Sequence, residues 1–254
     1  MLSYNTHGLS AWIAGDDPET RFPIIGEKSN AYDLALLQED FAHHAALLQE
    51  AEQPIVARGN PSRFGRWCPV CHGSGLTILS RLERQSLVEV VSRAYRECAG
   101  WIGGANDCFA TKGFQRMRIR LEGGAQLDLV NTHLDAGRSQ EDREARRGQL
   151  GLLRSSIEAE VGGGALILGG DLNLDAADPE DAALLGAFTR ALGLESSGAR
   201  GRSRWQTLDY IFYRSGGGLD LEVVEAGEDE SFVHQGAPLS DHPAIFARFA
   251  FSKR

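Results

Sequence analysis

The sequence has no long apolar run and no excess of basic residues. No stretch approaches the roughly 20 apolar residues of a membrane-spanning helix, so we expect no transmembrane segment. The formal net charge is −9, whereas nucleic-acid-binding proteins generally carry a basic surface. This balance disfavours a general nucleic-acid binder, although it is compatible with a local basic groove.

The chain also shows no secretion signal, internal repeat or long linker. Strand-like sequence begins directly after Met1, so no signal peptide is visible, and both a cytoplasmic protein and a mature secreted form stay open. The length of 254 residues, 42% of them hydrophobic, is enough for one sizeable core. We therefore expect a single domain over residues 1–254, and a monomer.

Cysteine is sparse, and its spacing does not complete a zinc site. Cys68 and Cys71 form a CxxC pair, but a structural zinc site generally needs a second, similarly spaced pair. The other two cysteines, Cys98 and Cys108, stand ten residues apart. Reduced packing cysteines, or one disulfide, are favoured over zinc binding.

Apolar runs and alternating segments predict many strands for the number of helices. Continuous apolar runs are typical of central strands, and the alternating segment 116–121 is typical of a strand with one wet face. We expect strands at 2–5, 33–38, 54–58, 76–81, 87–95, 114–121, 126–134, 165–170, 208–214, 219–226 and 244–251. Helical spacing and capping residues predict helices at 41–52, 139–161 and 178–193. This α/β mix favours two packed sheets flanked by helices over one doubly wound sheet.

Polar side chains follow several buried strands at the point where each strand ends. Asn5 and Glu39 each close an apolar segment, His133 closes another, and Asp171 and Asn173 follow the run at 165–170. Ligands in α/β sheets bind outside the carboxyl ends of the strands. If these strands are parallel neighbours, the five side chains converge on one pocket.

Two acids and a histidine near the C-terminus also lie within or next to predicted strands. Asp209 lies in the apolar run 208–214, where an unpaired carboxylate would be costly. Asp241 and His242 directly precede the last predicted strand, and a buried Asp commonly orients a neighbouring imidazole. These residues are therefore candidates for the same pocket.

Each of these residues also has a purely structural explanation. An Asp or Asn after a strand is often part of a turn, a carboxylate at a strand end is often solvated, and a lone histidine often packs in a core. The loop beginning at Asp171 resembles a calcium loop, but Ala176 and Ala182 occupy the positions that require Gly and Glu. The structural explanations must hold independently at every position, which weakens them as a set.

Seven short segments occur in the order typical of one known superfamily. They are LSYNTHGLS, LALLQE, GSGLTILSR, LVNTHLDAG, ILGGDLN, LDYIF and LSDHP. Together they resemble the endonuclease/exonuclease/phosphatase superfamily over nearly the whole chain. The resemblance implies a four-layer α/β sandwich and Mg²⁺-dependent hydrolysis of phosphate esters, with Mn²⁺ able to substitute.

The resemblance also implies a metal site. Glu39 is the expected principal ligand, with Asn5 and Asp241 close to the ion. Mg²⁺ prefers such hard oxygen ligands and keeps some of its waters. It neutralises charge on phosphoryl oxygens while a positioned base activates water for in-line attack.

The remaining strand-end residues take catalytic roles by the same resemblance. Asp171 and Asn173 are expected to position the attacking water and the phosphate. Asp209 and His242 are expected to form an Asp–His dyad, and His133 to contact a phosphate oxygen. The two glycines before Asp171 would let backbone and substrate approach each other closely.

One further segment points to a branch of the superfamily. NDCFATKGFQRMRI carries Asp107 and Lys112, and it resembles the segment of neutral sphingomyelinases in which a lysine serves the active site. Lys112 is thus expected to be catalytic and to bind substrate; the alternative is a strand-edge lysine that points into water. Secreted bacterial sphingomyelinases carry an aromatic hairpin for membrane contact, where this chain has an acidic interval with one exposed-looking aromatic, Phe232. We expect a phosphodiesterase for a small or lipid head group, without avid membrane binding.

Two other functions stay open at this point. A nuclease of the same superfamily could use a basic groove, although a solvated surface is the simpler account of its arginines, which are Arg63, Arg66, Arg116, Arg118, Arg200, Arg202 and Arg204. A catalytically inactive binding module on this fold is disfavoured, because no expected catalytic position is replaced.

Overall fold

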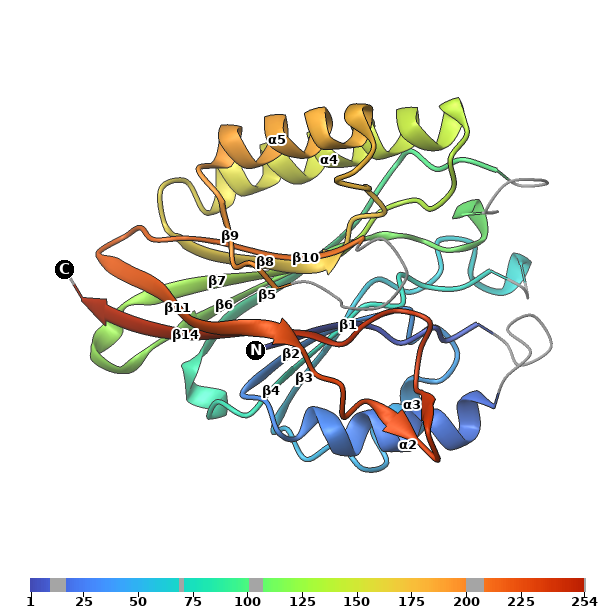
Figure 1. Ribbon diagram of the computed structural model, residues 1–254, viewed down its shortest axis with the longest axis horizontal. Helices are drawn as coiled ribbons and strands as arrows, with labels where there is room; N and C mark the ends of the chain where they lie inside the picture. The colour runs from blue at the N-terminus through green and yellow to red at the C-terminus, as the bar shows by residue number, and fades with distance from the viewer. Residues whose placement is uncertain (10–16, 69–70, 101–106, 200–207, 254) are drawn as a thin grey trace.

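Two six-stranded mixed sheets pack face to face, with helices on both outer sides (Figure 1). The computed structural model describes residues 1–9, 17–68, 71–100, 107–199 and 208–253. The architecture is the four-layer α/β sandwich that the motif order implied. Within the described ranges, no helix combines the length and the apolar character needed to cross a membrane.

The first sheet has the strand order β11-β14-β1-β2-β4-β3. Its strands are β1 (Leu2–Asn5), β2 (Leu34–Gln38), β3 (Ile55–Arg58), β4 (Thr77–Ser80), β11 (Leu219–Glu228) and β14 (Ile245–Lys253). Strands β1 and β2 are parallel, and Asn5 pairs with Gln38. Asn5 and the residue after β2, Glu39, therefore lie at the same edge of this sheet.

The second sheet has the order β5-β6-β7-β8-β10-β9. Its strands are β5 (Leu87–Ala94), β6 (Gly113–Arg120), β7 (Gln126–His133), β8 (Ala165–Asp171), β9 (Glu195–Ser196) and β10 (Asp209–Arg214). Parallel pairing of β7 and β8 sets His133 beside Asp171, and antiparallel pairing of β10 with β8 sets Asp209 on the other side of Asp171. The strands that end in polar residues are thus two parallel pairs in two sheets, and not four neighbours in one sheet.

The outer helices follow their capping signals. Helices α4 (Gln140–Glu160) and α5 (Pro179–Leu192) cover the second sheet, while α2 (Pro18–Ser29) and α3 (His44–Leu47) cover the first (Figure 1). Ser139 and Asp142 form a capping box at the start of α4. Asp178 caps α5 at its start, and Gly193 ends it with a φ of 62°, in the left-handed region that favours glycine. The predictions for these two helices are confirmed.

The helices over the first sheet differ from the sequence prediction. Helix α2 was not predicted, because Pro23 interrupts its sequence and its apolar periodicity is weak, yet it buries Phe22 and Ile25. The helix expected over 41–52 shortens to α3. The Asn30 side chain donates to the backbone carbonyl of residue 50 and accepts from the backbone N–H of residue 52. These backbone groups therefore form hydrogen bonds with a distant side chain and not within a helix.

Three apolar clusters separate the four layers. The cluster between the sheets includes Leu36, Met117, Leu129 and Ile245. The other two lie between each sheet and its helices. Phe232, which looked exposed in the sequence, is in fact only 4% exposed and packs edge-on against Tyr4 with ring centroids 4.9 Å apart. It directly precedes the small hairpin of β12 (Val233–His234) and β13 (Ala237–Pro238).

The four cysteines form two disulfides, Cys68–Cys71 and Cys98–Cys108. The expectation of reduced cysteines or a single disulfide is therefore wrong, and no cysteine is left free to bind zinc. Spacing alone could not show this, because the pairing depends on a fold that brings the Cα atoms of Cys98 and Cys108 to 5.2 Å.

Candidate active site

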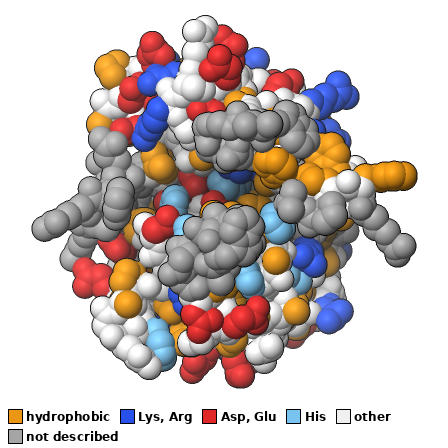
Figure 2. Space-filling model, turned by 90° about the vertical axis from the view of Figure 1, so that its right-hand side faces the viewer, with side chains coloured by type: hydrophobic (Ala, Val, Ile, Leu, Met, Phe, Trp, Pro, Cys, Tyr) orange, Lys and Arg blue, Asp and Glu red, His pale blue; other side chains and the backbone are white. Residues whose placement is uncertain are grey.

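The carboxyl ends of β1, β2, β7 and β8 meet at one end of the sandwich. Acidic and histidine side chains gather in a hollow on this face (Figure 2). The Asn5 amide nitrogen donates to Glu39 Oε1 and to Asp171 Oδ2, each at 3.0 Å. His133 Nε2 lies 3.7 Å from Glu39 Oε1 and 3.5 Å from Asp171 Oδ2. Four of the residues predicted from strand ends therefore share one site.

Glu39 takes an unusual backbone conformation. Its φ is 59°, in the left-handed region that costs a non-glycine residue about 1 kcal/mol or more. Gly8 packs against it so closely that a Cβ at Gly8 would lie 2.0 Å from the Glu39 carbonyl oxygen. The loop after β1 therefore requires glycine at this point, and it holds Glu39 where its side chain faces Asp171.

A pair of buried amides links the two sheets behind the site. Gln38 Nε2 donates to Asn131 Oδ1 at 2.8 Å, and Asn131 Nδ2 donates to the Leu37 carbonyl at 2.9 Å. Both amide side chains are fully buried. Because Gln38 precedes Glu39 and Asn131 lies two residues before His133, this bridge sets the distance between the two ligand groups. Sequence reasoning missed it, although amides inside apolar strands were a visible signal.

Asp209 and His242 form the predicted dyad. Asp209 Oδ2 lies 2.8 Å from His242 Nδ1, while Nε2 of the same ring lies 3.8 Å from Asp171 Oδ2. Burial acts to lower the pKa of His242, but the Asp209 and Asp171 carboxylates outweigh it and raise the pKa to about 11. Without a bound cation, the imidazole is therefore protonated at neutral pH.

Burial is the largest influence on the pKa values of Glu39, Asp171 and His133. It raises the pKa of Glu39, and it raises the pKa of Asp171 to about 6. Burial, with the nearby charges of Lys112 and His242, holds the pKa of His133 well below its ordinary value. His133 is neutral, and its Nε2 accepts a hydrogen bond from the Lys112 ammonium, so Lys112 engages the lone pair of this nitrogen.

These protonation states make the site suited to a cation. Glu39, His133 and Asp171 each offer a ligand atom, and the three atoms lie within 4.8 Å of one another. Once Glu39 and Asp171 are ionised, both carboxylates can bind a cation, whereas the lone pair of His133 Nε2 is free for one only after Lys112 releases it. The two carboxylates fit a hard divalent ion such as Mg²⁺ or Mn²⁺, whereas the imidazole nitrogen is a donor that suits softer ions.

The two other expected ligands lie differently. Among the described residues, potential metal ligands form two clusters that share Asp171, one with Glu39 and His133 and the other with Asp209 and His242. Asp241 belongs to neither; its side chain is 56% exposed, and its Oδ1 lies 3.1 Å from His7 Nδ1. Asn5 turns its nitrogen toward the carboxylates, since its oxygen accepts from the His7 backbone N–H. To act as a ligand, Asn5 would have to flip its amide.

Lys112 is buried, and the alternative of a strand-edge lysine in water is wrong. It is 4% exposed. Its ammonium donates to the Leu134 carbonyl at 2.8 Å and to His133 Nε2 at 3.1 Å, and it lies 2.6 Å from Asp107 Oδ1. The Asn173 amide also donates to the Leu134 carbonyl, at 2.9 Å. The carbonyl of Leu134 thus brings Lys112 and Asn173 together beside His133.

The glycines before Asp171 serve the packing of strands. A Cβ at Gly170, whose φ is 150°, would lie 2.0 Å from the Thr132 carbonyl oxygen of β7. A Cβ at Gly169 would lie 2.9 Å from Leu36 Cδ1 in the opposite sheet. These neighbours are protein atoms, so both glycines are required by the close approach of β7 and of the first sheet; the approach of substrate stays a prediction.

Two of the seven arginines proposed for a basic groove are engaged in ion pairs elsewhere. Arg116 pairs with Asp128 at 2.9 Å, and Arg118 pairs with the same carboxylate at 3.0 Å. Both sit on β6 among acidic partners. Arg200, Arg202 and Arg204 lie outside the described residues, as does the side chain of Arg66. The two described arginines of β6 therefore give no support to a nucleic-acid groove.

A sandwich of two mixed sheets, with carboxylates and imidazoles gathered where the strands of both sheets end, is typical of phosphoric ester hydrolases. The chain belongs to the endonuclease/exonuclease/phosphatase family, whose model matches residues 2–242. The superfamily resemblance drawn from the seven motifs is confirmed.

Several sphingomyelinases are among its relatives. The sphingomyelinase of Mycobacterium tuberculosis is 29% identical over 265 residues, which cover 96% of this chain and 51% of that protein. The chain thus spans about half the length of this relative. A magnesium-bound double variant of Staphylococcus aureus beta toxin matches with a TM-score of 0.71 and 20% identity, over 97% of both chains. Sphingomyelinase C of Streptomyces griseocarneus matches with a TM-score of 0.69 and 20% identity, also over 97% of both.

Proposed function

We propose that the protein is a divalent-cation-dependent phosphodiesterase of the sphingomyelinase type. The observation that carries the proposal is the cluster of Glu39, His133 and Asp171, whose ligand atoms lie within 4.8 Å of one another with Lys112 hydrogen-bonded to one of them. The match to sphingomyelinases over nearly the whole chain supports the choice of substrate class.

Glu39 would hold the ion, with Asp171 and His133 across from it. Asn5 could join through its oxygen after an amide flip, and Asp241 from the rim of the site. When bound, Mg²⁺ supplies positive charge that neutralises the phosphoryl oxygens. Mn²⁺ could replace it, since it accepts the same carboxylate and water oxygens.

The chain's own residues would bind and orient the phosphate. Lys112 donates charge-assisted hydrogen bonds, and Asn173 offers an amide beside it. His242 is held in orientation by Asp209 and is the candidate for moving the proton of the attacking water. Its pKa of about 11 reflects two nearby carboxylates, so positive charge bound at Asp171 would lower that pKa and free the ring to accept a proton.

Charge and surface shape guide the choice of substrate. The net charge of −9 repels DNA at long range, and the two described arginines of β6 pair with acids. The aromatic before the β12–β13 hairpin is buried, so this hairpin offers no aromatic anchor there for a bilayer. We therefore expect cleavage of soluble or detergent-dispersed phosphodiesters, including phosphocholine esters, with weak action on sphingomyelin in intact vesicles.

The decisive comparison is phosphocholine release from sphingomyelin in detergent against plasmid nicking, at equal enzyme, low salt and saturating Mg²⁺. The Glu39→Gln variant is the matched control for contaminating activity. Phosphocholine release that exceeds nicking and disappears in the variant would support the proposal. Efficient nicking without phosphocholine release would replace it with a nuclease, and absence of hydrolysis on both substrates would favour an inactive binding module.

A further inference from the structure

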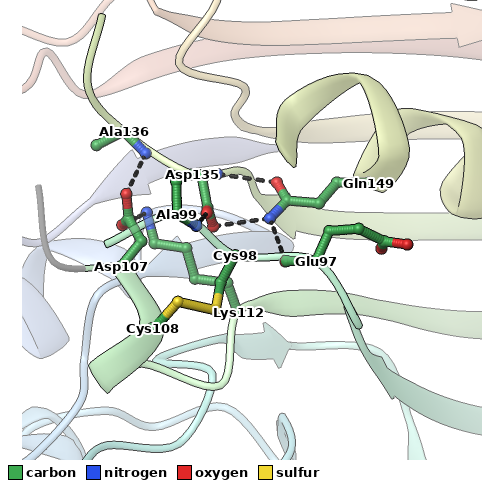
Figure 3. The surroundings of a disulfide bond; sticks show 9 residues. All are labelled: Glu97, Cys98, Ala99, Asp107, Cys108, Lys112, Asp135, Ala136 and Gln149. Carbon is green, nitrogen blue, oxygen red and sulfur yellow. Dashed lines mark hydrogen bonds and ion pairs between the residues drawn. A yellow bond between two sulfur atoms is a disulfide. The ribbon is translucent and has the colours of Figure 1, made fainter. Parts of the chain in front are cut away.

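The Cys98–Cys108 disulfide lies beside the buried Lys112 (Figure 3). Cys108 directly follows Asp107, whose Oδ1 lies 2.6 Å from the Lys112 ammonium. The other oxygen of the same carboxylate accepts from the Ala136 N–H at 2.8 Å. The disulfide therefore anchors the residue next to the carboxylate that pairs with Lys112.

The chain on both sides of Cys98 is held by a buried Asp–Gln pair. Asp135 Oδ2 accepts from the Ala99 N–H at 2.7 Å, directly after Cys98. Gln149 of α4 donates to Asp135 Oδ1 at 2.7 Å and to the Glu97 carbonyl at 3.0 Å, directly before Cys98. Asp135 and Gln149 are both fully buried. Figure 3 shows the two side chains lying side by side next to the disulfide.

These contacts close into a ring. From Asp135 the path leads through Ala99 to the disulfide, then through Asp107 to Ala136, which is bonded to Asp135 in the chain. Besides His133, Lys112 has two polar partners, and each belongs to this ring or lies next to it. One is the Asp107 carboxylate, and the other is the carbonyl of Leu134, the residue before Asp135. The ammonium thus contacts this ring on one side and His133 Nε2 on the other.

We propose that Asp135 and the Cys98–Cys108 disulfide are positioning groups that hold the Lys112 ammonium in the active site. The inference rests on the proposed function, in which this ammonium binds a phosphate oxygen. A flexible lysine side chain loses rotamer entropy when it is held in one place, so its placement depends on fixed partners. Neither Asp135 nor the disulfide has to touch substrate, because both act through Lys112.

The test is a double-mutant cycle with bis-p-nitrophenyl phosphate in Mg²⁺. We expect C98S/C108S to lower kcat by roughly tenfold or more, since small misplacements of a catalytic group are costly, with a smaller change in KM. In a Lys112→Gln background the same replacement should change kcat by less than about twofold, because the affected group is already gone. The matched control is C68S/C71S, which removes the other disulfide and should leave kcat unchanged in both backgrounds. The Asp135→Asn variant repeats the cycle with the disulfide intact, should C98S/C108S fold poorly.

An NMR measurement gives a readout that does not depend on activity. The chain has three lysines, so a ¹⁵N-lysine spectrum is simple, and the signal of the buried ammonium is assigned by its loss in Lys112→Arg. We expect a protected ammonium signal in the wild type and in C68S/C71S, and its loss or broadening in C98S/C108S and Asp135→Asn.

The outcomes separate the inference from the proposed function. Equal losses of kcat in the wild-type and Lys112→Gln backgrounds, or an ammonium signal that survives both replacements, would overturn the positioning role. Wild-type protein that hydrolyses no phosphodiester, but whose ammonium signal responds as described, would instead overturn the proposed function and leave the ring as the anchor of Lys112.

Discussion

Replacing Asp209 with Asn tests the dyad without changing its shape. Asp209 is 1% exposed, and its Oδ2 lies 2.8 Å from His242 Nδ1. Asn offers a neutral amide in the same volume, so the ring loses its charged partner and can be held in the wrong tautomer. Asp171 still provides negative charge on the Nε2 side, at 3.8 Å, so we expect the fold to survive.

The expected losses can be stated for turnover and for stability. Loss of a positioned proton acceptor lowers kcat by at least ~10²-fold, which corresponds to about 2.7 kcal/mol of transition-state stabilisation. Loss of a charge-assisted hydrogen bond costs roughly 2 kcal/mol of unfolding free energy, or about 4–8 °C in melting temperature at this chain length. The assay compares kcat for bis-p-nitrophenyl phosphate with urea unfolding of the same samples.

A matched control separates catalysis from stability. Asp128 is also a buried acid of the second sheet, 3% exposed and paired with Arg116 and Arg118. Asp128→Asn should lose comparable stability and keep its kcat. The reasoning about the dyad would be refuted if Asp209→Asn kept near-normal turnover, or if Asp128→Asn lost as much.

Three further predictions concern Lys112, the amide bridge and pH. Lys112→Ala should lower kcat at least ~10-fold and also cost about 3 kcal/mol in urea unfolding, because it leaves the Asp107 carboxylate buried and unpaired; unchanged kcat would remove Lys112 from the site. Asn131→Leu should cost roughly 2–4 kcal/mol, because Gln38 loses its acceptor, and it should lower turnover by shifting Glu39; a stable, fully active variant would contradict this. His242 has a folded pKa of about 11, above its ordinary 6.5, so its stabilising contribution is complete below pH 6.5 and declines as the pH rises toward 11. Urea unfolding of metal-free protein should show this decline, and Asp209→Asn should flatten it.

Most of the candidate site could be predicted because its residues follow buried strands. Glu39, His133 and Asp171 come directly after or at the end of apolar runs, and runs of this kind identify central strands. Parallel pairing within each sheet then brings their ends to one edge. The prediction did not show that two sheets contribute to the site, because sheet membership depends on pairing between segments distant in the sequence.

The features that were missed depend on contacts between distant segments. Helix α2 forms around Pro23 because its apolar side chains meet the first sheet, which local propensity does not reveal. Phe232 is buried because it packs against Tyr4, which lies near the other end of the sequence. The second disulfide and the Asp135–Gln149 pair likewise join segments whose proximity no local pattern indicates.

The most direct test of the central claim is cation dependence measured on one preparation. Wild-type protein is chelated exhaustively, assayed with bis-p-nitrophenyl phosphate, and assayed again after Mg²⁺ or Mn²⁺ is added, beside Glu39→Gln. We expect activity to disappear on chelation and to return with either ion in the wild type, while the variant stays inactive throughout. Full activity of the chelated wild type, or an active Glu39→Gln variant, would contradict the cation site at Glu39.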